Sequence, residues 1–228
     1  MFCLSWIRDL CILSSLSPHE SLNLFTLHQS NLSEIIRYSW VYAWGVPAVC
    51  HRVEQLGNRI TESERGILFI TFVGDKDFTK GGLHPRTELR SLKSLDSTRH
   101  HQFNMTVYPL SHPYSNFEFF QLMSYIPAAK PFLQLEFRNN KIGIRYLLPN
   151  KELGIYPIET IQRQKYMFTI EVKLPYLIVF MNGREVWKNN YSYIKFTEMW
   201  YQWGVYLNKV PKIDQSVLFE DLRVSVMK

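Results

Sequence analysis

Cysteine is scarce in this chain of 228 residues, and all three cysteines, Cys3, Cys11 and Cys50, lie in its first quarter. Because the later part of the chain has none, no disulfide framework can hold the main core together. A bridge between Cys11 and Cys50 stays open. The sequence also lacks the clusters of cysteine and histidine that bind metals, so we expect neither a metal nor another cofactor.

Long apolar runs are missing as well. Residues 1–17 are apolar apart from Arg8 and Asp9, but the stretch 11–16 is far shorter than the about 20 residues that cross a bilayer. The segment is similar to an atypical signal peptide without a basic start, and an irregular N-terminal extension is the alternative. Three Asn-x-Ser/Thr sequons, a pattern that also arises by chance, begin at Asn31, Asn104 and Asn190. We expect a secreted or extracellular protein without stable membrane insertion.

Dense blocks of lysine or arginine are absent, although the chain is basic overall. Its formal net charge is +6 and its pI is about 9.2. This balance favours an acidic partner, which can be nucleic acid, an anionic membrane surface or an acidic polysaccharide. Since no basic block and no RNA-binding signature occurs, we expect no nucleic-acid partner.

No convincing long helix is visible, although a short helix before Trp40 stays open. Short apolar or alternating runs are instead separated by turn residues. The clearest turn signals are Asn139-Asn140-Lys141 and Asn182-Gly183, and Asn-Gly strongly indicates a hairpin. The expected strands cover residues 38–44, 67–73, 84–91, 103–108, 116–124, 132–138, 142–148, 166–174, 177–181, 184–187, 200–208 and 217–226.

This succession of short strands predicts an all-β fold, a β-sandwich or jelly roll. The 46% hydrophobic and 15% aromatic content can fill one sizeable core. We therefore expect one domain over residues 51–228, preceded by an irregular N-terminal extension over residues 1–50.

The most charged expected strand begins at His84. Side chains alternate in a strand, so His84, Arg86, Glu88 and Arg90 share one face. At the usual rise per residue the row is about 20 Å long, which makes it a candidate site. The alternative is a solvated outer face, on which Glu88 does no more than relieve the repulsion between its arginine neighbours.

A second candidate is Gln121, an amide in a strongly apolar strand. Strict alternation places it on the same face as Phe117, Phe119 and Met123. The amide either serves a site or bonds to the backbone of a neighbouring strand. Both interpretations stay open at this point.

The third candidate is the strand 200–208. One face carries polar and aromatic groups, and the other reads as core. Gly204 on the polar face would let a ligand approach the backbone closely, whereas Tyr206 can also be read as half-buried packing. The residues of the polar face are Trp200, Gln202, Gly204, Tyr206 and Asn208.

Together these segments resemble a known family. Arg86-Thr87-Glu88-Leu89-Arg90, then Gln121, then Tyr201-Gln202-Trp203-Gly204-Val205-Tyr206 are similar to the motifs of the alginate lyase and glucuronan lyase superfamily. That family has an Arg-Thr/Ser-Glu-Leu-Arg strand, a Gln-Ile/Val-His strand and a Tyr-Phe-Lys-Ala-Gly-x-Tyr-x-Gln strand. The resemblance covers roughly residues 50–226, including a similar closing strand at 219–224. It implies a concanavalin-like jelly roll.

The resemblance also implies a chemistry. These lyases cut uronic-acid chains by β-elimination, in which a base takes the proton beside the carboxylate and an acid protonates the leaving oxygen. Arg86 and Gln121 would stabilise the charge that builds on the carboxylate. Tyr206 matches the family's acid, which sometimes also serves as base. The implied substrate-binding residues are Arg90, Glu88, Gln202 and Asn208. The partner would then be an acidic polysaccharide, and we expect a monomer.

Two positions depart from the family pattern. Met123 stands where the family has histidine, and a thioether can neither accept nor deliver that proton. Gln202 stands where the family has lysine. His84, on the face of Arg86, would compensate as base, and the alternative is an ordinary histidine at a strand edge.

Three functions follow from these residues. The first is a lyase that acts on an acidic polysaccharide. The second is a protein on the same scaffold that has lost turnover and binds an acidic glycan or a small carboxylate such as citrate, with Arg86, Arg90 and Gln121 as ligands. The third is a structural or interaction protein that uses only the sandwich.

Overall fold

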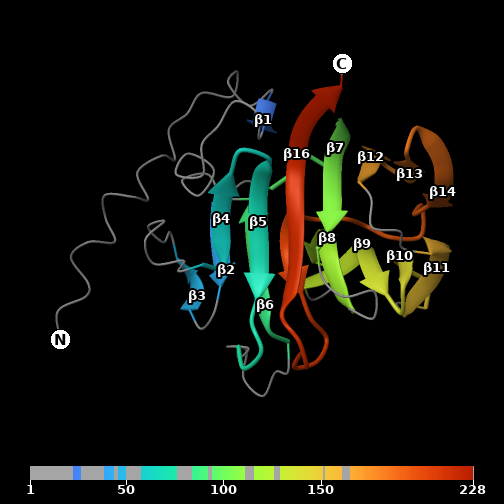
Figure 1. Cartoon of the computed structure of the whole chain (residues 1–228). Helices are drawn as coiled ribbons and strands as arrows, with labels where there is room; N and C mark the ends of the chain where they lie inside the picture. Colours follow the sequence, from blue (N-terminus) through green and yellow to red (C-terminus); the bar gives the residue numbers. More distant parts are fainter. Residues whose placement is uncertain are drawn as a thin grey trace, which may run out of the picture.

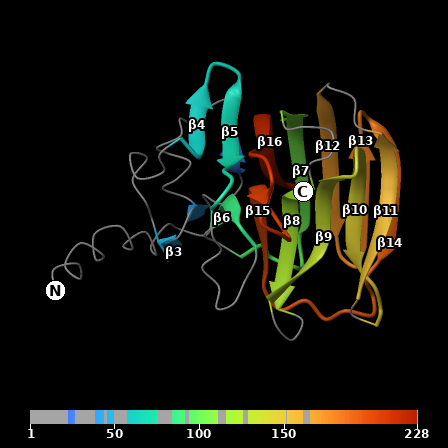
Figure 2. The same ribbon diagram turned by 60° about the horizontal axis from the view of Figure 1, so that its bottom comes forward.

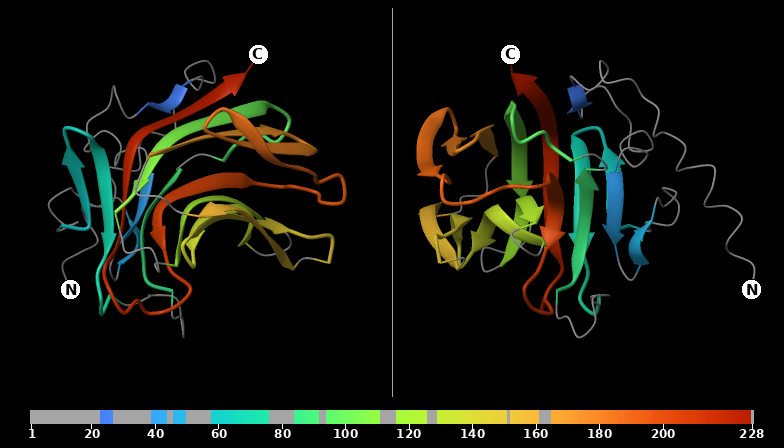
Figure 3. Two further views of the ribbon diagram at one scale, coloured as in Figure 1. Left: turned by 45° about the vertical axis from the view of Figure 1, so that its right-hand side comes forward. Right: turned by 180° about the vertical axis from the view of Figure 1, so that it is seen from behind.

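The structure, a computed structural model, describes residues 23–26, 39–43, 46–49, 58–75, 84–91, 94–110, 116–125, 129–150, 152–160 and 165–227. In this part of the chain sixteen strands form two eight-stranded sheets, and all strand pairs are antiparallel (Figure 1). The described residues contain no helix long and apolar enough to span a membrane. The two sheets lie face to face as two layers (Figure 2, Figure 3), so the predicted all-β sandwich is confirmed.

The first sheet, sheet A, has the strand order β14-β13-β12-β7-β16-β5-β4, with β1 paired to β16. Strands distant in the chain are neighbours here, as a jelly roll requires. The bounds are β1 (Asn23–Thr26), β4 (Ile60–Ser63), β5 (Gly66–Thr71), β7 (His100–Pro109), β12 (Tyr166–Lys173), β13 (Tyr176–Met181), β14 (Arg184–Asn190) and β16 (Gln215–Met227).

The second sheet, sheet B, has the order β11-β10-β9-β8-β15-β6-β2-β3. Its centre joins β8, β15 and β6, which come from three distant parts of the chain. The bounds are β2 (Ser39–Ala43), β3 (Val46–Val49), β6 (Arg86–Ser91), β8 (Phe117–Tyr125), β9 (Ala129–Arg138), β10 (Lys141–Leu147), β11 (Leu153–Thr160) and β15 (Met199–Tyr206).

The core lies between the sheets and is rich in aromatic rings. Phe69 of sheet A packs edge-on against Trp203 of sheet B, with ring centroids 4.8 Å apart. Phe103 of β7 meets Phe120 of β8 in the same way, at 5.4 Å. Each fully buried ring of this kind contributes about 1.5–3 kcal/mol. The apolar faces of the two sheets are thus buried against each other. The outer face of sheet B is left for polar groups.

The predicted hairpins are confirmed. Asn139 and Asn140 connect β9 to β10 with φ of 50° and 59°. Asn182 and Gly183 connect β13 to β14 with φ of 51° and 78°. All four residues adopt the left-handed conformation, which asparagine and glycine tolerate best.

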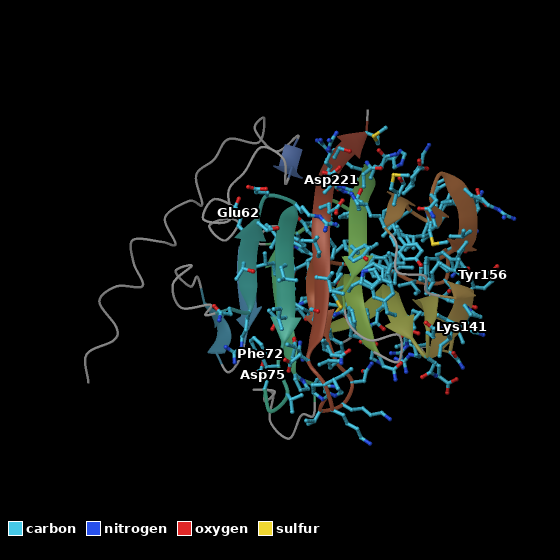
Figure 4. All side chains as sticks on the ribbon, in the orientation of Figure 1. Glu62, Phe72, Asp75, Lys141, Tyr156 and Asp221 are labelled. Atoms are coloured by element: carbon cyan, nitrogen blue, oxygen red, sulfur yellow. The ribbon has the colours of Figure 1, made fainter. Side chains whose placement is uncertain are left out.

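An ion pair fixes the end of β5, where the chain leaves sheet A. Arg59 donates to Asp75 over 2.7 and 3.2 Å, and Asp75 accepts the backbone N–H of Phe72 at 2.9 Å. Phe72 and Asp75 lie together at this end of the molecule, far from Lys141 and Tyr156 at the β10–β11 edge (Figure 4).

Some expectations from the sequence differ from the structure, and others concern residues outside the described part of the chain. The sequence did not predict β1, β3, β4 and β11. Because β1, β2 and β3 pair into the sheets, residues before 51 contribute to the sandwich, while the domain boundary at 50 stays a prediction. The three cysteines, the signal-like segment 1–17 and the sequon at Asn31 lie outside the described residues.

Candidate active site

The register of sheet B brings the sequence motifs together. From β6 to β15, Arg86 is paired with Tyr206 and Arg90 with Gln202. From β15 to β8, Gln202 is paired with Gln121. These strands lie side by side in Figure 2. We call the outward side of the sheet the polar face; its residues are Arg86, Glu88, Arg90, Glu118, Gln121, Gln134, Glu136, Arg145, Gln202 and Tyr206.

The alternate residues of β6 anchor that strand to the core. The hydroxyl of Thr87 donates to the carbonyl of Ile70 in sheet A at 2.8 Å and accepts from the hydroxyl of Thr71 at 3.0 Å. Leu89 is fully buried. Since neighbours in a strand point to opposite sides, this anchoring turns Arg86 and Glu88 outward.

The ring of Tyr206 contacts two predicted site residues. The guanidinium carbon of Arg86 is 4.6 Å from the centre of the Tyr206 ring. The ring of His84 stacks on the same phenol, with centroids 5.7 Å apart and planes 11° apart. The Nε of Arg86 also donates to the backbone carbonyl of His84 at 3.4 Å. A cation, an imidazole and a phenol therefore share one half-buried place, and their catalytic roles stay a prediction.

Gln121 bonds to side chains. Its nitrogen donates to Glu88 Oε1 at 2.7 Å, and its oxygen accepts from the amide of Gln134 at 3.0 Å. Glu88 has no exposed surface, so its interpretation as a solvated residue is wrong. Burial raises the pKa of Glu88 to about 7, against the opposing effects of Arg86 and of the bond from Gln121.

The expected position of Phe119 beside Gln121 was wrong because β8 contains a bulge. The pairing with β9 shifts between Glu118 and Phe120, so strict alternation fails there. Phe119 points into the core, where its ring lies 5.5 Å from that of Phe168. Glu118 instead joins Gln121 on the polar face.

Glu118 is the centre of a charged cluster that sequence reasoning missed. Its Oε1 accepts from Asn208 at 2.5 Å, from Arg145 at 2.9 Å and from Arg138 at 3.4 Å. Glu136 pairs with Arg138 at 3.0 Å. Burial raises the pKa of both carboxyls, and the arginines oppose that shift. The amide of Asn208, expected to bind substrate, is thus engaged by Glu118.

The signal for this cluster was a lone glutamate between phenylalanines. Glu118 is the one charged residue in the run 117–123, and such a charge is rarely buried without partners. Its partners come from β9, β10 and the residues after β15, which no local pattern connects to it.

Arg90 and Gln202 lie at the other end of the row. The guanidinium carbon of Arg90 is 4.3 Å from the ring centre of Trp200, a cation–π contact. Gln202 is buried between Arg90 and Gln121 in the register. Their roles as substrate-binding residues stay predictions.

Gly204 serves strand packing, so its interpretation as an opening for a ligand is corrected. Its φ is +132°, and a Cβ there would lie 2.3 Å from the carbonyl oxygen of Thr87 and 3.0 Å from the Cα of Glu88. The register of β15 against β8 also shifts between Trp203 and Tyr206. The glycine therefore lets β6 come close to a bulged β15.

Met123 lies on β8, two residues after Gln121. It is half-buried, and β15 presents Trp200 opposite it. The described residues contain no group of three or more His, Cys, Asp or Glu side chains that could hold a metal ion.

Comparisons with known proteins give structural relatives only. No family model matches the sequence, and no curated protein matches it. The alginate lyase AlyC3 has a TM-score of 0.70 at 10% identity, over 93% of this chain and 99% of that one. An alginate lyase from Pseudomonas aeruginosa has a TM-score of 0.67 at 17% identity, over 83% and 99%. The family 7 alginate lyase A1-II′ has a TM-score of 0.68 at 14% identity, over 83% and 94%. The chain thus has the jelly-roll fold of the alginate lyases, as the resemblance implied.

Proposed function

We propose that the protein is a polysaccharide lyase that cleaves an acidic, uronic-acid-containing polysaccharide by β-elimination. The observation that supports this best is the contact of the Tyr206 ring with both the guanidinium of Arg86 and the imidazole of His84, on a fold shared with alginate lyases. The fold alone would fit many functions. This combination of a carboxylate-binding cation with two proton carriers fits the elimination.

The reaction assigns one task to each group. His84 takes the proton from the carbon beside the uronate carboxylate, the electron pair forms the new C=C bond, and the glycosidic C–O bond breaks. Tyr206 gives its proton to the leaving oxygen and later regains one from solvent or from His84. Positioned proton transfer of this kind contributes on the order of 10²- to 10⁴-fold in rate.

Negative charge builds on the substrate carboxylate as its neighbouring proton leaves. Arg86 pairs with that carboxylate, and the amide of Gln121 donates to it. One such preorganised donor is worth about 3 kcal/mol in the transition state. Arg90 and Gln202 extend the same face for neighbouring sugar units.

The charge of the chain and the ligands of the structural relatives support the proposed substrate class. The net charge of +6 favours a polyanion. AlyC3 is known in complex with dimannuronate, and A1-II′ in complex with the substrate GGMG. A polyuronate is therefore the proposed substrate, and the proposal includes a monomeric protein outside the cell.

A second candidate is a binding protein on the same scaffold. Met123 favours it, because the thioether removes a proton carrier that the lyase pattern places there. Arg86 and Arg90 would then bind an acidic glycan or a small carboxylate such as citrate without turnover.

One assay separates the candidates. The purified protein is mixed with alginate, glucuronan and heparin-type polymers, and the ultraviolet absorbance of the unsaturated product is followed. A rise in absorbance supports the lyase. Saturable binding by calorimetry without a rise supports the second candidate, and the absence of both overturns the two together.

A further inference from the structure

A directed chain of hydrogen bonds crosses the polar face. The amide nitrogen of Gln134 donates to the oxygen of Gln121, and the nitrogen of Gln121 donates to Glu88. All three side chains are at most 3% exposed. Water therefore has little access to these three side chains, and they must satisfy one another's hydrogen-bonding groups.

The acceptor at its end sets the direction of the chain. Above its pKa of about 7, Glu88 is ionised, and an ionised carboxylate only accepts hydrogen bonds. Glu88 thus accepts a hydrogen bond from the amide nitrogen of Gln121. The oxygen of Gln121 is then left to accept from the amide nitrogen of Gln134. An amide is nearly symmetric in shape, so packing alone would not choose between its two orientations.

The orientation matters because of where the partners lie in the sheet. Glu88 is on β6, the strand of Arg86, whereas Gln134 is on β9, across β8. The nitrogen of Gln121 therefore faces the side of the sheet that carries Arg86 and Tyr206. A reversed amide would turn its oxygen toward that side and repel a substrate carboxylate.

Keeping a carboxylate at position 88 costs stability. Glu88 is fully buried, and its Oε2 has no hydrogen-bond partner in the described part of the chain. Burial raises its pKa to about 7, despite the nearby Arg86. A glutamine would occupy the same volume without a buried charge, so the charge itself points to a function.

We propose that Glu88, together with Gln134, is a positioning residue that holds the amide nitrogen of Gln121 toward Arg86 and Tyr206, where it donates to a polyuronate carboxylate. The proposal rests on the lyase function and adds two side chains to its machinery. Neither residue touches the reacting atoms. They act through Gln121.

The decisive variant exchanges the two residues at the ends of the hydrogen-bond chain. In the double variant Glu88→Gln/Gln134→Glu, the acceptor sits on β9, so the amide of Gln121 is expected to reverse. Composition and net charge do not change. We expect kcat on the cleaved polymer to fall by about 10²-fold, the effect of one lost donor, while KM changes much less. The single variant Glu88→Gln is expected to lower kcat in the same direction.

A second measurement reports the orientation directly. By NMR, the side-chain amide hydrogens of Gln121 are expected to show Overhauser contacts to residue 88 in the wild type and to residue 134 in the double variant. Glu136→Gln is the matched control, since it removes a buried charge from the polar face without contacting Gln121, and its kcat is expected to stay within a few-fold of wild type.

The outcomes separate the two proposals. A wild type that makes no product from any polymer overturns the lyase function, and the NMR contacts then still decide the orientation. The positioning role is overturned if the folded double variant keeps its kcat, or if its Gln121 hydrogens keep their contacts to residue 88. If the double variant does not fold, unchanged kcat and contacts in Glu88→Gln overturn it equally.

Discussion

Arg86 and Tyr206 face each other at the same register position of β6 and β15, with the guanidinium carbon 4.6 Å from the centre of the phenol ring. The contact joins two strands that are far apart in the chain and adjacent in the sheet. Two central strands, rather than a loop, thus hold the cation beside the phenol. Groups held on strands keep their geometry better than groups on loops.

Tyr206→Phe is expected to lower the rate of product formation strongly while the fold persists. The ring keeps its contacts with Arg86 and His84, but the proton for the leaving oxygen is gone, so kcat falls by about 10²- to 10⁴-fold. The absorbance assay measures this loss. Tyr176→Phe, which removes an exposed hydroxyl from sheet A, is the control. Activity of Tyr206→Phe close to that of the control would remove the tyrosine from the mechanism.

Met123→His is expected to increase turnover. It places an imidazole on the strand of Gln121, two residues further on, at a half-buried position. The gain in kcat should be about tenfold or more, with a new limb in the pH profile near the usual imidazole pKa of about 6.5. Met123→Leu serves as control. No gain, and no new limb, would mean that His84 already fills this role or that the face only binds.

Glu88→Gln is expected to stabilise the protein at alkaline pH. The pKa of Glu88 is raised from 4.5 to about 7 in the folded state by burial. Its protonated form therefore contributes stability that is fully present below 4.5 and is lost as the pH rises through 7. One pKa unit corresponds to about 1.4 kcal/mol, so the variant should gain up to a few kcal/mol over wild type by about pH 8.

Urea denaturation at about pH 5 and about pH 8 measures this gain. Glu118 and Glu136 also have raised pKa values, but they are present in both proteins, so the difference isolates Glu88. A difference between variant and wild type that does not change with pH would contradict the buried-charge account. A more stable variant with lower kcat would show that the carboxylate is kept for function.

The sequence predicted the strands wherever a local signal was strong. The alternation over Tyr166–Lys173 is observed as a buried face and a wetted face, and both asparagine turns form hairpins. The short strands β4 and β11 escaped prediction. β4 has only four residues, and three of its side chains are polar. β11 contains Gly154 and Pro157, which argue against a strand locally.

Only those site residues that belong to the sequence motifs could be predicted. Arg86, Gln121 and Tyr206 were placed on one face by alternation and by resemblance, and the register brings them together. Glu118 was missed, since one bulge in β8 shifts which side chains turn outward. A bulge depends on the pairing of two strands, so no single-strand pattern reveals it.

Gly204→Ala is expected to be the most damaging of these substitutions. A Cβ would lie 2.3 Å from the carbonyl oxygen of Thr87, and the φ of +132° is itself strained for alanine. Backbone strain and the clash together should cost roughly 3–5 kcal/mol in urea denaturation. Because β6 must move away from β15 to make room, the Arg86–Tyr206 contact should be lost as well, so activity falls even where the variant is folded.

Gly183→Ala is the matched control for Gly204→Ala. Gly183 also has a positive φ, of +78°, but a Cβ there meets nothing within 4 Å. It should therefore cost only the conformational penalty of about 1–2 kcal/mol and leave product formation unchanged. Equal losses of stability in both variants would show that β6 and β15 can separate freely at Gly204, and would contradict the tight pairing on which the contact between Arg86 and Tyr206 depends.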